Sequence, residues 1–85
     1  LRKVTENIKW EGSNYKIEDV DIHLIAEFLQ EVKNCEIRVL NVPRGKYKVT
    51  GNIDPSLTTS QILDNLCFAL KMKYIHAKGV YTITQ

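Results

Sequence analysis

Apolar and polar positions along the chain follow two cycles, in each of which a strand-like alternation gives way to a helical period. The first cycle begins at Tyr15-Lys16-Ile17 and the second at Tyr47-Lys48-Val49. Each continues with a stretch whose apolar residues lie three or four positions apart, and then with a second alternating stretch. The pattern predicts a doubled β-α-β unit.

The first amphipathic stretch predicts a helix that begins near Ile22, after Asp19 and Asp21, whose carboxylates can cap the exposed amides. The helix is expected to end at Lys33-Asn34, because a cation suits the negative end and asparagine tolerates a left-handed stop. Its predicted apolar face comprises Ile22, Ile25, Phe28, Leu29 and Val32, and its predicted polar side comprises His23, Glu27, Gln30 and Glu31.

The second amphipathic stretch predicts a helix after the strand-breaking pair Asp54-Pro55. Thr58 and Gln61 have the spacing of a capping box, and Lys71 is placed at the negative end. The predicted apolar face comprises Ile62, Leu63, Leu66, Cys67, Ala69 and Leu70.

The remaining alternating segments predict strands separated by turns at Glu11–Asn14 and Asn41–Gly45 and by a hairpin at Ala77-Lys78-Gly79. The predicted strands are Val4–Trp10, Tyr15–Ile17, Cys35–Leu40, Tyr47–Ile53, Tyr74–His76 and Val80–Thr84. Together the elements predict an α+β fold in the order β-βαβ-βαβ-β, with two helices packed on short mixed sheets.

The length of 85 residues predicts one domain over positions 1–85. The net charge of +2 is spread along the chain and does not indicate a nucleic-acid or anionic-membrane partner. No apolar run is long enough to cross a bilayer, and no signal peptide is present. Since the sequence begins at Leu1, we expect it to be a piece of a larger protein, and any targeting or membrane segment would lie outside it.

The sequence does not predict a metal or any other cofactor. Cys35 and Cys67 are expected to be core thiols, although a disulfide between them stays open, and with His23 and His76 they have no recognised ligand spacing. His23 is expected on the helix surface and His76 on an exposed strand.

Catalytic residues are likewise not predicted. A Gly-x-Ser-x-Gly turn is missing, and Glu18-Asp19 and Asp21 are assigned to turns and caps. The chain is therefore not expected to be an enzyme.

The sequence favours a binding function over catalysis. Its residues bear on two classes of partner, RNA and protein. RNA-recognition domains share the β-α-β-β-α-β order, and Arg44-Gly45 matches the start of their third strand. However, Lys46, Lys48 and Gly51 occupy positions where stacking aromatics belong, and Tyr47 and Val49 are expected to face inward. A protein partner can instead add a strand to an exposed sheet edge. The segments Val4–Trp10 and Tyr81–Gln85 are the predicted edges, and the predicted partner-binding residues are Tyr81, Thr82, Ile83 and Thr84.

Several stretches together resemble the C-terminal domain of FecR-like anti-sigma regulators, especially those of Bacteroides-type bacteria. In the first half these are Trp10–Gly12, Tyr15–Val20, the helix and Cys35–Val39. The second half resembles the family's closing strand, helix and hairpin through Tyr47–Ile53, Thr58–Leu66 and Tyr74–Thr84. The end of the first helix departs from the family pattern, since Gln30–Asn34 lacks the aromatic and arginine residues often found there.

The resemblance implies a periplasmic interaction domain of a single-pass inner-membrane protein. A TonB-dependent outer-membrane receptor would contact it through the receptor's N-terminal signalling domain. The parent's cytoplasmic part would bind an extracytoplasmic-function sigma factor. The domain is also similar to the short signalling module of secretins and TonB-dependent receptors, which is the first alternative. A small RNA-binding domain is the second.

Overall fold

The computed structural model describes residues 7–85, which form an α+β fold as predicted. The strands and helices, in chain order, are β1 (Ile8–Glu11), β2 (Asn14–Asp21), α1 (Ile22–Lys33), β3 (Glu36–Val39), β4 (Lys48–Ile53), α2 (Thr59–Leu70), β5 (Lys73–Ala77) and β6 (Val80–Thr84).

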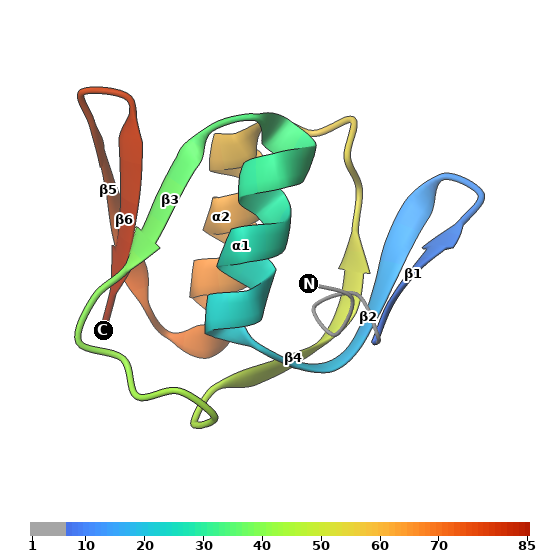
Figure 1. Ribbon diagram of the computed structural model, residues 1–85, viewed down its shortest axis with the longest axis horizontal. Helices are drawn as coiled ribbons and strands as arrows, with labels where there is room; N and C mark the ends of the chain where they lie inside the picture. Colours follow the sequence, from blue (N-terminus) through green and yellow to red (C-terminus); the bar gives the residue numbers. More distant parts are fainter. Residues whose placement is uncertain (1–6) are drawn as a thin grey trace.

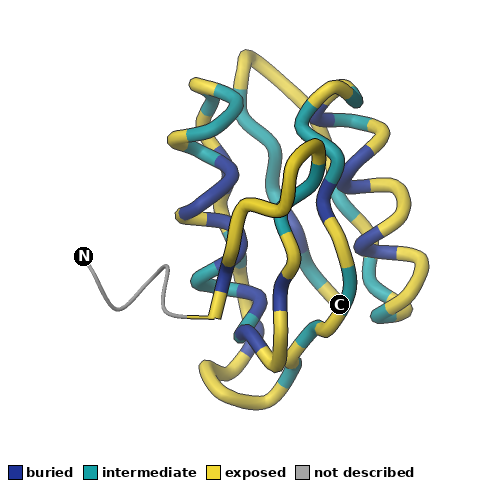
Figure 2. The backbone as a smooth tube through the Cα atoms, turned by 90° about the vertical axis from the view of Figure 1, so that its right-hand side faces the viewer, coloured by how far each residue is buried: buried dark blue, intermediate teal, exposed yellow. Residues whose placement is uncertain are grey.

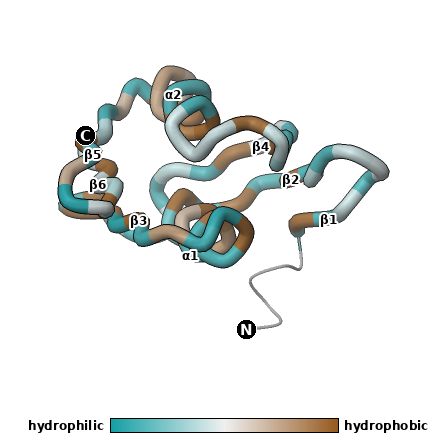
Figure 3. Tube along the Cα trace, turned by 90° about the horizontal axis from the view of Figure 1, so that it is seen from above, coloured by the Kyte–Doolittle hydropathy of each residue, from teal (hydrophilic) through white to brown (hydrophobic). Residues whose placement is uncertain are grey.

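The strands form two separate three-stranded sheets with the helices between them (Figure 1). The first sheet has the order β1-β2-β4 and is antiparallel. The second has the order β3-β6-β5, with β3 parallel and β5 antiparallel to β6. Seen from above, α1 and α2 lie on opposite sides of the space that separates the two sheets (Figure 3). Two helices and two sheets thus enclose one core.

The core is mainly aliphatic, with Phe28 and Cys67 among its buried residues, and draws on both cycles of the sequence. The buried positions of both helices face the interior (Figure 2). The largest fully buried side chains are Ile17, Ile22, Ile25, Leu29, Leu63 and Ile83. Neither helix within residues 7–85 has the length and apolar content that a membrane span requires.

Helix α1 begins and ends where the sequence predicts. Asp21 is the N-cap and accepts a hydrogen bond from the amide of His23, and Asn34 ends the helix in the left-handed conformation. Asp19 is not a cap, since it lies at a bulge in β2 with a φ of 53° and donates its amide to the Thr50 hydroxyl. Strand β2 consequently runs on to Asp21, beyond the predicted end at Ile17.

Helix α2 begins with the predicted capping box between Thr58 and Gln61 and ends at Lys71, which has a left-handed conformation. Its apolar face was predicted too wide, because Ala69 is exposed. Leu63, Leu66 and Cys67 are buried, and Phe68 is 86% exposed.

The remaining boundaries agree with the predicted strands to within a few residues. In the last hairpin, Lys78 and Gly79 both have positive φ, which is the geometry of a type I′ turn. The predicted strand Val4–Trp10 is confirmed for Ile8–Trp10, and its residues 4–6 lie outside the described residues.

Candidate interaction site

The predicted edge at Tyr81–Thr84 is wrong, because these residues lie in β6, the central strand of its sheet. Strand β3, some 40 residues earlier in the chain, pairs with one side of β6, and β5 pairs with the other. Within residues 7–85 the strands at the ends of the two sheets are β1, β4, β3 and β5. The prediction of an edge near Trp10 is confirmed for β1.

The β3 edge is partly covered by helix α1. The Gln30 side-chain oxygen accepts the Ile37 amide at 2.8 Å, and the Gln30 carbonyl accepts the Cys35 amide at 3.2 Å. A side chain predicted to lie on the polar side of the helix therefore satisfies one backbone donor of the β3 edge, the Ile37 amide. This arrangement limits the addition of a further strand beside β3.

The β5 edge is open. The Ile83 carbonyl accepts the Leu40 amide at 2.9 Å, so the peptide groups of Ile83 point toward β3 and away from β5. Tyr74 lies opposite Ile83, and His76 lies two residues further on. Because antiparallel pairs alternate between bonded and non-bonded, the backbone groups of Tyr74 and His76 point to the free side of β5. No described residue forms a backbone hydrogen bond to them.

The side chains of β5 make this edge partly apolar and partly aromatic. Ile75 is 63% exposed on the outer face of the sheet, in one row with Thr82 and Arg38. On the other face the exposed His76 ring stacks on Tyr81, with centroids 3.9 Å apart and planes 9° from parallel. The sequence prediction of His76 as an exposed strand residue is confirmed.

Tyr74 fixes β5 against helix α2. Its hydroxyl donates to the Asp64 carboxylate at 2.8 Å and also contacts the Ser60 carbonyl at 3.3 Å. The hydrogen bond to Asp64 raises the pKa of the Tyr74 phenol, so the phenol stays protonated and remains a donor at neutral pH. The β5 edge is thus held in place by contacts from its inner face.

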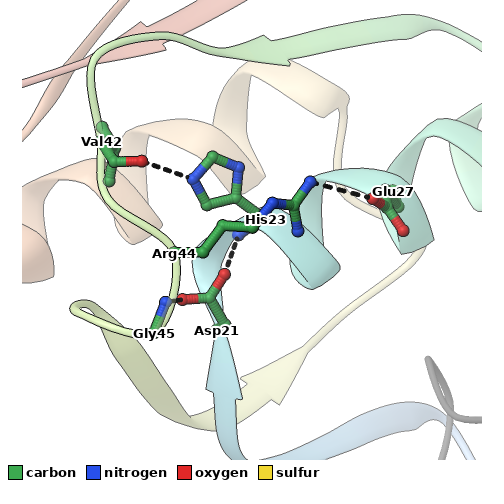
Figure 4. A network of polar contacts seen from close by, with 6 residues as sticks. All are labelled: Asp21, His23, Glu27, Val42, Arg44 and Gly45. Atoms are coloured by element: carbon green, nitrogen blue, oxygen red, sulfur yellow. Dashed lines mark hydrogen bonds and ion pairs between the residues drawn. The ribbon is translucent and has the colours of Figure 1, made fainter.

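A second polar arrangement surrounds the start of α1 and fixes the loop before β4 (Figure 4). The two Asp21 carboxylate oxygens accept the amides of His23 and Gly45 at 2.9 and 2.6 Å. His23 Nε2 donates to the Val42 carbonyl at 2.7 Å. His23 is therefore half-buried and bound to the loop, rather than a surface residue as predicted.

Replacing Asp21 by alanine is expected to lower the free energy of unfolding by about 1–2 kcal/mol, because the helix loses its cap and the Gly45 amide loses its acceptor. Urea denaturation measures this loss, and amide shifts of Gly45 report the loop. Asp21→Asn keeps one side-chain oxygen as acceptor and should lose less. Equal losses for both variants would contradict the capping role.

A groove of about 290 Å³ lies between α1, β3 and this loop. Two guanidinium groups border it, and each has a carboxylate neighbour. Arg44 lies 3.8 Å from Glu27, and Arg38 lies 2.7 Å from Glu36. Because opposite charges offset one another at its rim, the groove offers no strong attraction for an anionic ligand.

The basic residues Arg44, Lys46 and Lys48, which bear on RNA binding, do not lie on one face of a strand. Arg44 and Lys46 lie in the loop, and only Lys48 belongs to β4. Lys46 lies over the Tyr47 ring, 5.4 Å from its centroid. Tyr47 and Val49 are half-buried against the core, as predicted.

The candidate ligands and nucleophiles are dispersed. Among residues 7–85 no group of three or more histidine, cysteine, aspartate and glutamate side chains is arranged to hold a metal ion. Cys35 and Cys67 are both free thiols. Cys67 is buried as predicted, and burial raises its pKa to about 11, which keeps it protonated at neutral pH. Cys35 is only half-buried and lies 3.8 Å from the Thr59 hydroxyl.

The sequence pattern predicted the free sheet edge on the wrong strand of the last hairpin. The alternation in Tyr74–His76 does indicate that Ile75 faces away from the core. It carries no information on which strand of the hairpin β3 would join.

No protein-family model matches the sequence, and no curated protein or solved structure shows significant similarity to the chain.

Proposed function

We propose that this domain is a non-enzymatic protein-interaction module, the periplasmic C-terminal domain of a FecR-like anti-sigma regulator. Its partner is the N-terminal signalling domain of a TonB-dependent outer-membrane receptor. The parent protein would bind an extracytoplasmic-function sigma factor through its cytoplasmic part. The observation that carries the interaction role is the open β5 edge with exposed Ile75. The family assignment rests on the sequence resemblance.

Strand addition is the mode of binding that this edge supports. Tyr74 and His76 offer backbone donors and acceptors at alternate positions, and a partner strand can pair with them. Ile75 provides apolar area on the outer face of the sheet. A receptor would bias the regulator by binding this edge more tightly in one of its two states, since only differential affinity shifts an equilibrium.

A titration tests the proposal. The ¹⁵N-labelled domain is mixed with the signalling domain of the receptor encoded beside its parent gene, and amide shifts are followed. Saturable shifts centred on Lys73–Ala77 are expected. His76→Pro removes a donor on the free side of β5, where the fold tolerates proline, and should weaken binding about tenfold or more.

A pair of side-chain variants distinguishes binding at the β5 edge from non-specific hydrophobic association. Ile75→Thr removes exposed apolar surface from β5 and should weaken binding. Leu40→Thr makes a comparable apolar-to-threonine change at a 49% exposed position beyond β3 and should not weaken binding. Saturable shifts elsewhere would contradict the β5 assignment, and no binding by the folded domain would contradict the receptor partnership.

The second candidate function is the signalling module of a TonB-dependent receptor or secretin, which the doubled β-α-β order favours equally. Gene order distinguishes the two. A regulator gene should lie between a sigma-factor gene and a receptor gene, whereas the signalling module would be encoded within the receptor or secretin gene itself.

A further inference from the structure

A different edge of the molecule bears on self-association. Strand β4 pairs with β2 on one side only. The Tyr47 carbonyl accepts the Ile22 amide at 2.9 Å and so points toward β2. By the alternation of antiparallel strands, the peptide groups of Lys48, Thr50 and Asn52 point to the opposite side. No described residue forms a backbone hydrogen bond to them there.

An apolar groove of about 170 Å³ follows this free side of β4. Its far wall is α2, since β4 lies between β2 and that helix (Figure 3). Helix α2 contributes Ile62, Asn65, Leu66 and Ala69 to this wall, and Leu57 from the turn before the helix extends it. Unlike the β3 edge, where Gln30 satisfies a backbone donor, this edge faces a mainly aliphatic wall, and no described side chain forms a hydrogen bond to its outward peptide groups.

The charges at the two ends of β4 are complementary to each other. Lys48 begins the strand, and Asp54 follows its last residue. Among the described residues neither side chain forms an ion pair. Asp54 accepts hydrogen bonds from the amide and hydroxyl of Ser56, which lower its pKa and keep it ionised at neutral pH.

We infer that β4 pairs antiparallel with the β4 of a second copy of this chain about a two-fold axis at Gly51, giving a homodimer with one continuous six-stranded sheet. Gly51 is the midpoint between Lys48 and Asp54, so this register sets each Lys48 opposite the partner copy's Asp54. Thr50 then faces Asn52, and both belong to the set with outward peptide groups. The inward side chains of Val49 and Ile53 lie over the apolar groove of the other copy. This surface is separate from the β5 edge assigned to the receptor.

Sedimentation velocity of the whole 85-residue chain, under reducing conditions and up to millimolar concentration, tests the inference. A concentration-dependent shift from monomer to dimer is expected. Ala69→Arg places a long cation in the groove from an exposed position and should abolish the shift. Glu31→Arg, on the exposed surface of α1, is the control for an added arginine away from the groove and should leave the shift unchanged. The proposal is overturned if the wild-type chain stays monomeric at all concentrations, or if Ala69→Arg dimerises as the wild type does.

Charge reversal tests the register. Lys48→Glu alone and Asp54→Lys alone should each weaken self-association roughly tenfold or more, because both contacts of the dimer become repulsive. An equimolar mixture of the two folded variants restores both contacts and should associate like the wild type. If the mixture remains monomeric while each variant keeps its native circular dichroism spectrum, the Lys48–Asp54 register is wrong and the proposal fails.

Discussion

Replacing Thr82 by proline is expected to destabilise the domain by about 3 kcal/mol or more, because β6 is a central strand. Ile83 turns its peptide groups toward β3, so those of Thr82 point toward β5 and pair with Ile75. Proline removes the amide donor and forces its ring between two paired strands. Thermal or urea unfolding measures the loss.

His76→Pro is the control for this result. His76 lies on β5, and its amide points to the free side, so proline there breaks no bond between strands. The free energy of unfolding of His76→Pro should fall by about 1 kcal/mol or less, mostly because the ring stack on Tyr81 is lost. If Thr82→Pro and His76→Pro lowered the free energy of unfolding equally, the assignment of β6 as the central strand would be wrong.

Leu63→Ala is expected to cost about 3–5 kcal/mol, since the side chain is fully buried and its loss leaves a cavity among rigid neighbours. A domain of 85 residues has a total stability of roughly 4–13 kcal/mol. The variant should therefore be close to unfolding at physiological temperature. Urea denaturation followed by circular dichroism provides the measurement.

Leu40→Ala makes the same chemical change at a position that is 49% exposed. Its expected cost is below about 1 kcal/mol, because most of the removed surface is already in contact with water. A loss for Leu40→Ala similar to that for Leu63→Ala would show that burial does not decide these values, and that the core is not centred between the two helices.

Short-range sequence signals determined both helices. The Thr58 capping box, the Asp21 cap and the Asn34 stop each act within one helical turn, so their residues identify the helix ends without any knowledge of the remainder of the fold. The final hairpin was predictable for the same reason, since Gly79 accepts the positive φ that a two-residue turn requires. The α+β class followed from the order of these elements.

Longer-range pairing decided the candidate site. Whether β6 or β5 forms the edge depends on where β3 joins the hairpin, and a strand buried on one face has the same alternating pattern in either position. Gln30 and His23 are polar residues in a helical period, and only the packing of α1 against β3 and the loop at Val42 turns them into partners of the backbone.

The sequence by itself therefore determined the order of the elements, the ends of both helices and most of the core-facing positions of the helices, because these depend on period, capping and hydrophobicity along a single segment. The tertiary structure alone decided the division into two sheets, the open edges at β4 and β5 and the groove beside α2. Those features arise from contacts between segments far apart in the chain, and the pattern within one segment does not encode which other segment it will meet.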